Sequence, residues 1–185
     1  YTRASRLWSE WFEKGILKRD DRPAVYLYEQ EFDLEAKRVR RRGFIPLLRL
    51  EPFGRTVLRH ERTLPGPKSD RLSLMRGVSA QLSPVFGLFE DQRGEVESLL
   101  DPYYRTPPVF DFRDDPGTAH RLWRLQEEGV LGELSERMAA RTLLIADGHH
   151  RYETALAYRD EIRRSTRVVP DASLHYVMID LNRIE

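Results

Sequence analysis

Residues 146–152, with the sequence ADGHHRY, combine residue types that bind an anion at the start of a helix. Gly148 can adopt a positive φ and lets another group approach its backbone closely. Tyr152 and Ala155 follow at helical spacing, which predicts a helix whose first turn presents unpaired N–H groups and a partial positive charge. Arg151 adds a planar fork of donors that suits phosphate oxygens. We therefore predict an anion-binding turn at the junction of a strand and a helix, with phosphate as the expected anion.

Two adjacent histidines support this prediction and also raise alternatives. His149 and His150 are further donors. Cationic groups at a helix N-terminus are unfavourable because of the helix dipole, and a bound anion offsets this cost. In the first alternative, Asp147 is only an N-cap and the histidines are exposed. A metal site is a weaker alternative, because adjacent histidines point in different directions and the others lack ligand spacing: His60, His120 and His175. The residues assigned to the anion site are Asp147, Gly148, His149, His150 and Arg151.

A second polar segment, residues 60–68 with the sequence HERTLPGPK, carries ionisable side chains between proline and glycine constraints. Such a rigid loop is typical of a preorganised polar site. Glu61 is the candidate general base for a substrate hydroxyl, and Lys68 the candidate point charge for a phosphate. Arg62 is a further candidate phosphate ligand. The alternative is a structural loop whose charges form surface ion pairs.

The elements that must position these segments follow from apolar periodicity and turn residues. The pattern predicts helices over residues 2–14, 69–81, 95–101, 130–140 and 149–163. It predicts strands over residues 24–31, 38–50, 84–90, 109–112, 118–125, 141–146 and 173–181. The apolar strand before Asp147 is expected at the centre of the sheet, and residues 60–67 are expected to lack regular structure. Trp8, Trp11 and Trp123 are interpreted as core side chains.

This order of elements favours an α+β fold with a mixed twisted sheet. We interpret residues 1–185 as a single domain, and as a fragment of a longer chain, because the chain has no initiator methionine and ends just after an apolar run. The chain has no cysteine, which excludes disulfides, thiolate metal sites and a cysteine nucleophile, and fits a cytoplasmic protein.

Charge and hydropathy limit the expected partners. The formal net charge of +1 gives no global field for nucleic acid, and no apolar run approaches the roughly 20 residues of a membrane span. Four arginines cluster at positions 38, 40, 41 and 42. Because they lack interleaved aromatic residues and have acidic neighbours, a solvated strand edge is favoured over a nucleic-acid patch. The oligomeric state stays open.

Residues 147–155, DGHHRYETA, resemble the phosphate-binding box of the ParB/sulfiredoxin superfamily, and in particular that of the ParB-like free serine kinase. His149 stands where sulfiredoxins carry their cysteine, so sulfiredoxin chemistry is excluded. A longer resemblance joins residues 60–68, the segment 82–88 (LSPVFGL) and residues 146–159. In this order, these segments resemble domain-of-unknown-function family ten-fifteen. The resemblance of residues 147–155 to the ParB/sulfiredoxin box implies a strand, turn and helix that bind nucleotide phosphates.

Together these observations lead to two hypotheses. In the first, the protein is a kinase-like phosphotransferase that uses ATP or ADP with Mg²⁺ on a small hydroxyl substrate. Glu61 would activate the hydroxyl, while Lys68 and Arg62 would neutralise developing charge. In the second, the protein is a non-catalytic nucleotide-binding or regulatory module. The distance between Glu61 and Arg151 discriminates them, because a shared active site requires both residues within the length of one nucleotide.

Overall fold

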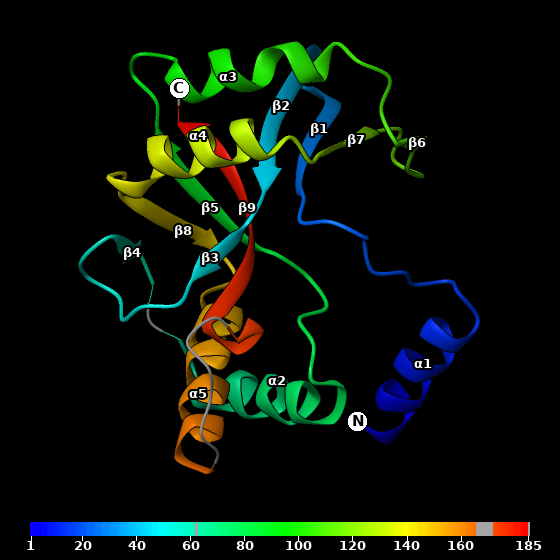
Figure 1. The fold of residues 1–185 in the computed structure, drawn as a ribbon, viewed down its shortest axis with the longest axis vertical. Helices are drawn as coiled ribbons and strands as arrows, with labels where there is room; N and C mark the ends of the chain where they lie inside the picture. Colours follow the sequence, from blue (N-terminus) through cyan, green and yellow to red (C-terminus); the bar gives the residue numbers. More distant parts are fainter. Residues whose placement is uncertain (62, 166–171, 185) are drawn as a thin grey trace.

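A computed structural model describes residues 1–61, 63–165 and 172–184, and confirms an α+β fold with a mixed sheet (Figure 1). Within these residues the sheet has nine strands, eight of which follow the order β4-β8-β5-β9-β2-β1-β7-β6, while β3 pairs with β9. The pairs β4–β8 and β5–β9 are parallel and the other pairs are antiparallel. The strands are β1 (Val25–Leu34), β2 (Lys37–Ile45), β3 (Leu47–Arg49), β4 (Val57–Arg59), β5 (Val85–Glu90), β6 (Phe110–Arg113), β7 (Ala119–Leu125), β8 (Leu143–Asp147) and β9 (Tyr176–Ile184).

The helices form two pairs at opposite ends of the molecule. The helix α3 packs with α4 at one end and α2 with α5 at the other (Figure 1), and α1 contacts α2. Their bounds are α1 (Thr2–Glu13), α2 (Pro65–Val78), α3 (Glu95–Tyr104), α4 (Glu128–Ala139) and α5 (His149–Ser165), with a short 3₁₀ helix η1 (Ser173–His175) before β9. None of the described helices is long and apolar enough to cross a membrane.

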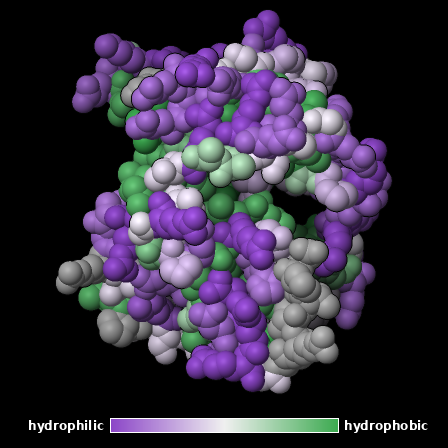
Figure 2. All heavy atoms as spheres, turned by 60° about the vertical axis from the view of Figure 1, so that its left-hand side comes forward, coloured by the Kyte–Doolittle hydropathy of each residue, from purple (hydrophilic) through white to green (hydrophobic). Residues whose placement is uncertain are grey.

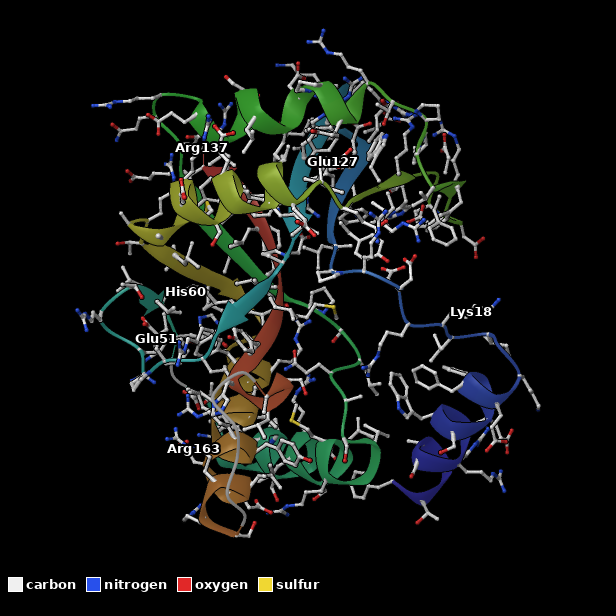
Figure 3. The ribbon with its side chains drawn as sticks, in the orientation of Figure 1. Lys18, Glu51, His60, Glu127, Arg137 and Arg163 are labelled. Atoms are coloured by element: carbon white, nitrogen blue, oxygen red, sulfur yellow. The ribbon has the colours of Figure 1, made fainter. Side chains whose placement is uncertain are left out.

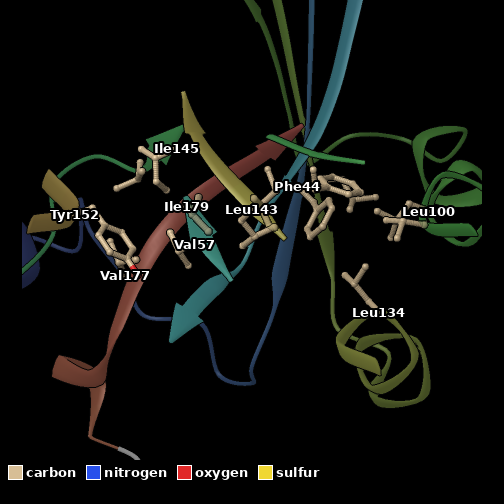
Figure 4. Packing of buried hydrophobic residues seen from close by; sticks show 14 of the residues in the cluster. Phe44, Val57, Leu100, Leu134, Leu143, Ile145, Tyr152, Val177 and Ile179 are labelled. Carbon is tan, nitrogen blue, oxygen red and sulfur yellow. The ribbon is translucent and has the colours of Figure 1, made fainter. Parts of the chain in front are cut away.

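The buried core lies between the sheet and the helices of both ends. Figure 4 shows Leu100 of α3 and Leu134 of α4 on the side of Phe44, and Tyr152 of α5 beside Val177. These side chains are at least nine-tenths buried, so each removes most of its apolar surface from water. The face drawn in Figure 2 is largely hydrophilic, with hydrophobic residues visible near its middle.

The helix after the polar loop begins at Pro65, earlier than the predicted Ser69. The expectation that residues 60–67 lack regular structure is therefore wrong for the last three of them. Proline is tolerated in the first turn of a helix, where its missing N–H would have no partner and its fixed φ already suits the helix. Ser79, in the left-handed conformation, ends α2 before the predicted Gln81.

The predicted strand over residues 38–50 is two strands, because Pro46 separates β2 from β3. The short strand β4 had no counterpart in the prediction. It pairs with β8, so β8 lies second from the edge of the sheet rather than at its centre. Trp123 is buried as predicted, but Trp11 is exposed, because α1 packs mainly on α2 and buries none of its side chains fully.

Candidate functional site

The turn between β8 and α5 has the backbone geometry that the sequence predicts. Gly148 has a φ of +90° between Asp147, the last residue of β8, and His149, the first of α5. A Cβ atom at this position would lie 2.8 Å from Nε of Arg151. The first helical bond runs from the N–H of Tyr152 to the carbonyl of Gly148, at 2.9 Å. The N–H groups of the three preceding residues therefore lie outside the helical ladder, at the positive end of the helix dipole.

Arg151 links this turn to Ser83 and Pro84, the two residues just before β5. Its guanidinium donates to the carbonyl of Pro84 and to Asp147, and lies 3.2 Å from Oγ of Ser83. The side chain of Arg151 is 23% exposed and that of Asp147 is 73% exposed. The guanidinium therefore has a positioning role, and an anion bound at the turn would share its donors with Asp147.

The loop that contains Glu61 reaches the same turn because of the sheet register. Strand β4 runs parallel to β8, with Arg59 opposite Ile145. The residues that follow each strand consequently leave the sheet side by side at one edge. His60 Nε2 donates to the carbonyl of Ala146 at 3.0 Å, which fixes this arrangement. Carboxyl ends of neighbouring parallel strands are where open α/β sheets bind ligands.

His149 lies at the centre of the junction and is 1% exposed. Its Nδ1 is 3.3 Å from a carboxylate oxygen of Glu61, and the ring of His60 packs against it edge to face, with 4.6 Å between centroids. Burial lowers the pKa of His149, and the neighbouring His60 acts in the same direction, while the charge of Glu61 opposes the shift. The other ring nitrogen of His149, Nε2, is buried and has no partner among the described residues.

His150 and Glu153 hold the second half of the loop. The N–H of Leu64 donates to Nε2 of His150 at 3.1 Å. Glu153 accepts from Lys68 at 2.8 Å, from Arg59 at 3.2 Å and from the hydroxyl of Thr63. These contacts join the first two turns of α5 to Arg59, Thr63, Leu64 and Lys68.

The electrostatics of Glu153 reflect these contacts. Burial alone would raise the pKa of its carboxyl group. Hydrogen bonds from Lys68 and Thr63, with the charges of Lys68 and Arg59, outweigh burial and lower the pKa of Glu153. Neither Glu153 nor Arg59 is among the site residues predicted from the sequence. The signal for Glu153 was available, because it follows His149 by four residues and so lies on the same face of the helix.

Tyr152 fixes α5 against the segment that leads into β4. Its ring is fully buried, and its hydroxyl donates to the carbonyl of Glu51 at 2.9 Å and accepts from the N–H of Glu51 at 3.2 Å. The carboxylate of Glu51 in turn accepts from the N–H groups of Thr56 and Val57, both at 3.1 Å. Figure 3 shows Glu51 and His60 on the same side of the molecule, near the beginning of α5. This network sets the position from which β4 starts.

A small cavity of about 70 Å³ lies behind the turn, lined by Arg151, Ser83 and Thr154 among others. The hydroxyl of Thr154 is buried without a partner among the described residues. The cavity has room for water but is too small for a nucleotide. A nucleotide at this turn would therefore lie on the outer surface, against the N–H groups that begin α5.

The structure brings most of the predicted site residues together. Glu61 and Lys68 contact α5 within its first two turns, next to the residues assigned to the anion site. Lys68 is paired with Glu153, so it is not an isolated charge. Arg62 lies outside the described residues. In the described part of the chain, no group of three histidine or acidic residues has the geometry of a metal site.

Comparison with known proteins identifies a family for this chain. The family described as "Protein of unknown function (DUF1015)" matches residues 1–184. No curated protein and no solved structure matches the chain. Since the match covers nearly the whole chain, including both polar motifs and the strands that join them, the chain belongs to the DUF1015 family.

Proposed function

We propose that the turn between β8 and α5 binds the phosphates of a nucleotide, ATP or ADP, and that the protein transfers a phosphoryl group to a small hydroxyl substrate. The observation that carries this proposal is the contact between the two polar motifs, in which Glu61 lies 3.3 Å from His149. Arg151 follows His149 by two positions, which is about 3 Å along a helix axis. The two positions lie within one turn of α5 but project about 200° apart around its axis, so the proposal requires a nucleotide that wraps around the beginning of the helix.

The contacts of the described residues support a division of roles. The N–H groups before Tyr152, with His150 and Arg151, would hold phosphate oxygens at the positive end of α5. Glu61, which is half exposed, would accept the proton of the substrate hydroxyl as its oxygen attacks phosphorus and the bond to the leaving nucleotide oxygen breaks. Lys68 would neutralise charge on the transferring group, and the same role for Arg62 rests on the sequence alone.

Magnesium is expected with the nucleotide. A magnesium ion that binds with a nucleotide is held mainly by phosphate oxygens and one or two carboxylates. Asp147 is the best placed carboxylate, because it is largely exposed beside the turn. The metal would neutralise phosphate charge and align the reacting oxygens.

The second candidate function is nucleotide binding without turnover. One observation favours it: the cations nearest the turn already have carboxylate partners, Arg151 with Asp147 and Lys68 with Glu153. In that case, the loop would hold α5 in place and Glu61 would only orient His149. The two functions make the same prediction for nucleotide binding and differ for phosphate transfer.

A thermal-shift titration tests the shared part of both functions. ATP and ADP, each with and without Mg²⁺, are titrated against the wild type, Arg151→Lys and the control Arg76→Gln, whose side chain pairs with Glu161 away from the turn. A nucleotide at a hundred times its Kd stabilises the native state by about 2.7 kcal/mol, or roughly 5–11 °C in a chain of this size. Arg151→Lys should weaken this shift, because it removes the planar fork, while Arg76→Gln should keep it. A wild type that no nucleotide stabilises would contradict both functions.

Nucleotide turnover then separates the two candidates. Conversion of the bound nucleotide is followed by phosphorus NMR with a panel of small hydroxyl compounds, using wild type and Glu61→Gln. For a phosphotransferase, Glu61→Gln keeps the thermal shift and loses transfer. Binding without conversion of any acceptor in the panel favours the binding module.

A further inference from the structure

A cavity of about 450 Å³ is lined by residues of β2, β5, β9 and α3. Figure 1 shows α3 at the end of the molecule opposite α5. The strands β2 and β9 pair only at Gly43 with Asn182 and at Phe44 with Leu181. At Gly43 they approach so closely that a Cβ atom would lie 2.6 Å from the carbonyl oxygen of Leu181. The residues of β2 that precede Gly43 do not pair with β9, and residues of α3 line the space next to them.

The residues that line this cavity form an apolar surface and include more arginines than carboxylates. Phe44, Phe86 and Leu181 contribute apolar wall. Four arginines and three carboxylates line the rest: Arg40, Arg41, Arg42 and Arg183, with Asp91, Glu97 and Asp101. One positive charge is therefore left over within the lining.

The ion pairs, some of them with acids outside the lining, show which arginine lacks a carboxylate partner, and Arg183 is paired with Glu97. Glu31 stands opposite Arg40 and Glu29 opposite Arg42, and both arginines form ion pairs with these acids. Arg41 instead stands opposite Gln30 and donates to its neutral amide oxygen. Among the ion pairs of the described residues, none involves Arg41.

The guanidinium of Arg41 is held over aromatic rings at the cavity. It lies 5.1 Å from the ring centroid of Phe86 and 6.0 Å from that of Phe32. Such stacking positions the planar fork while leaving its edge free for an acceptor. Arg41 also acts on Asp180 through its charge: burial raises the pKa of Asp180 to about 6, and the charge of Arg41 opposes this shift. The positive charge of Arg41 is thus only partly balanced, next to an apolar wall.

We propose that this cavity is a second binding site, for a small monoanion with a flat apolar body, such as an aromatic carboxylate or sulfonate. The acid group accepts from Arg41 and the ring lies against Phe86 and its apolar neighbours. The volume suits a ligand of this size. A nucleotide fits poorly, because the lining contains three carboxylates and only one arginine without a carboxylate partner, which cannot balance several phosphates. The site is independent of the turn between β8 and α5.

The fluorescent aromatic sulfonate 1-anilinonaphthalene-8-sulfonate tests the proposal on the whole chain. We expect saturable binding at one site in the wild type. Arg41→Gln removes the cation, and Gln30→Glu keeps the cation but gives it the carboxylate partner that its neighbours have. Each change should weaken the Kd by about tenfold or more, the usual effect of losing one hydrogen bond to a charged group.

Arg40→Gln is the matched control, because Arg40 lines the same cavity but is already paired with Glu29 and Glu31. It should leave the Kd within about twofold of the wild type. The uncharged analogue N-phenyl-1-naphthylamine should bind Arg41→Gln and the wild type equally. Saturable sulfonate binding that is unchanged by both Arg41→Gln and Gln30→Glu would place the ligand elsewhere and overturn the proposal. Lack of saturable binding to the wild type would overturn it as well.

Discussion

The contact of Glu153 with the polar loop leads to a quantitative prediction for Glu153→Gln. The carboxylate is 15% exposed and accepts from three groups outside α5: Arg59, Lys68 and Thr63. Because Arg59 and Lys68 are 45% and 38% exposed, each ion pair is screened and contributes about 0.2–1 kcal/mol. The hydrogen bond from Thr63 adds about 0.5–1.5 kcal/mol.

Taken together, these contacts predict that Glu153→Gln lowers the free energy of unfolding by about 1–3 kcal/mol at neutral pH. In a chain of this size the midpoint temperature falls by roughly 2–12 °C. Urea unfolding followed by circular dichroism measures the change directly. Glu161→Gln is the control, since Glu161 also joins α5 to α2 through an ion pair with Arg76, but both side chains are more exposed. We expect a smaller loss for the control.

The dependence on pH provides the decisive check. The pKa of Glu153 in the folded chain is lowered from its ordinary value of 4.5. The unfolded chain therefore binds the proton first as the pH falls, so the contribution of Glu153 is fully present above about pH 4.5 and is lost as the pH drops through the folded pKa. The difference between the wild type and Glu153→Gln should shrink in that range. A difference that stays constant down to the lowest pH at which the protein folds, or a loss no larger than that of Glu161→Gln, would refute the reasoning.

Three further predictions concern other parts of the fold. Asp91→Ala should cost about 3–5 kcal/mol and reduce the helical signal in circular dichroism, because its fully buried carboxylate accepts from three N–H groups at the start of α3 and pairs with Arg141. Gly43→Ala should cost about 1–3 kcal/mol in urea unfolding, because the new Cβ meets the backbone of Leu181. Burial lowers the pKa of His149 from 6.5, so the unfolded chain binds this proton first and stability should fall as the pH drops below that value. The fall, measured by urea unfolding, should be smaller in His149→Asn.

The strand, turn and helix around Gly148 were predictable because every signal is local. An apolar strand, a glycine that adopts a positive φ and a helical face marked by Tyr152 and Ala155 all lie within about a dozen residues. The same holds for most strands, which the structure confirms to within a few residues at each end. The proline-rich beginning of α2 was misjudged, because proline breaks a helix in its interior but fits its first turn.

The convergence of the two motifs was not predictable from the residues alone. It depends on β4, which has only three residues and is too short to show an alternating pattern. The exposure of Trp11 was missed for a related reason, since an amphipathic helix does not reveal how much of the molecule covers its apolar face. The distinct role of Arg41 within the arginine cluster appears only with the register that places Gln30 opposite it.

The short strand β4 also determines how the candidate site assembles and opens. It joins partners 86 positions apart in the chain through three residue pairs with β8, so its closure depends on a long loop. Such an edge element forms late in folding and detaches with a small part of the global unfolding energy. Amide hydrogens of β4 should therefore exchange faster than those of β5 and β9.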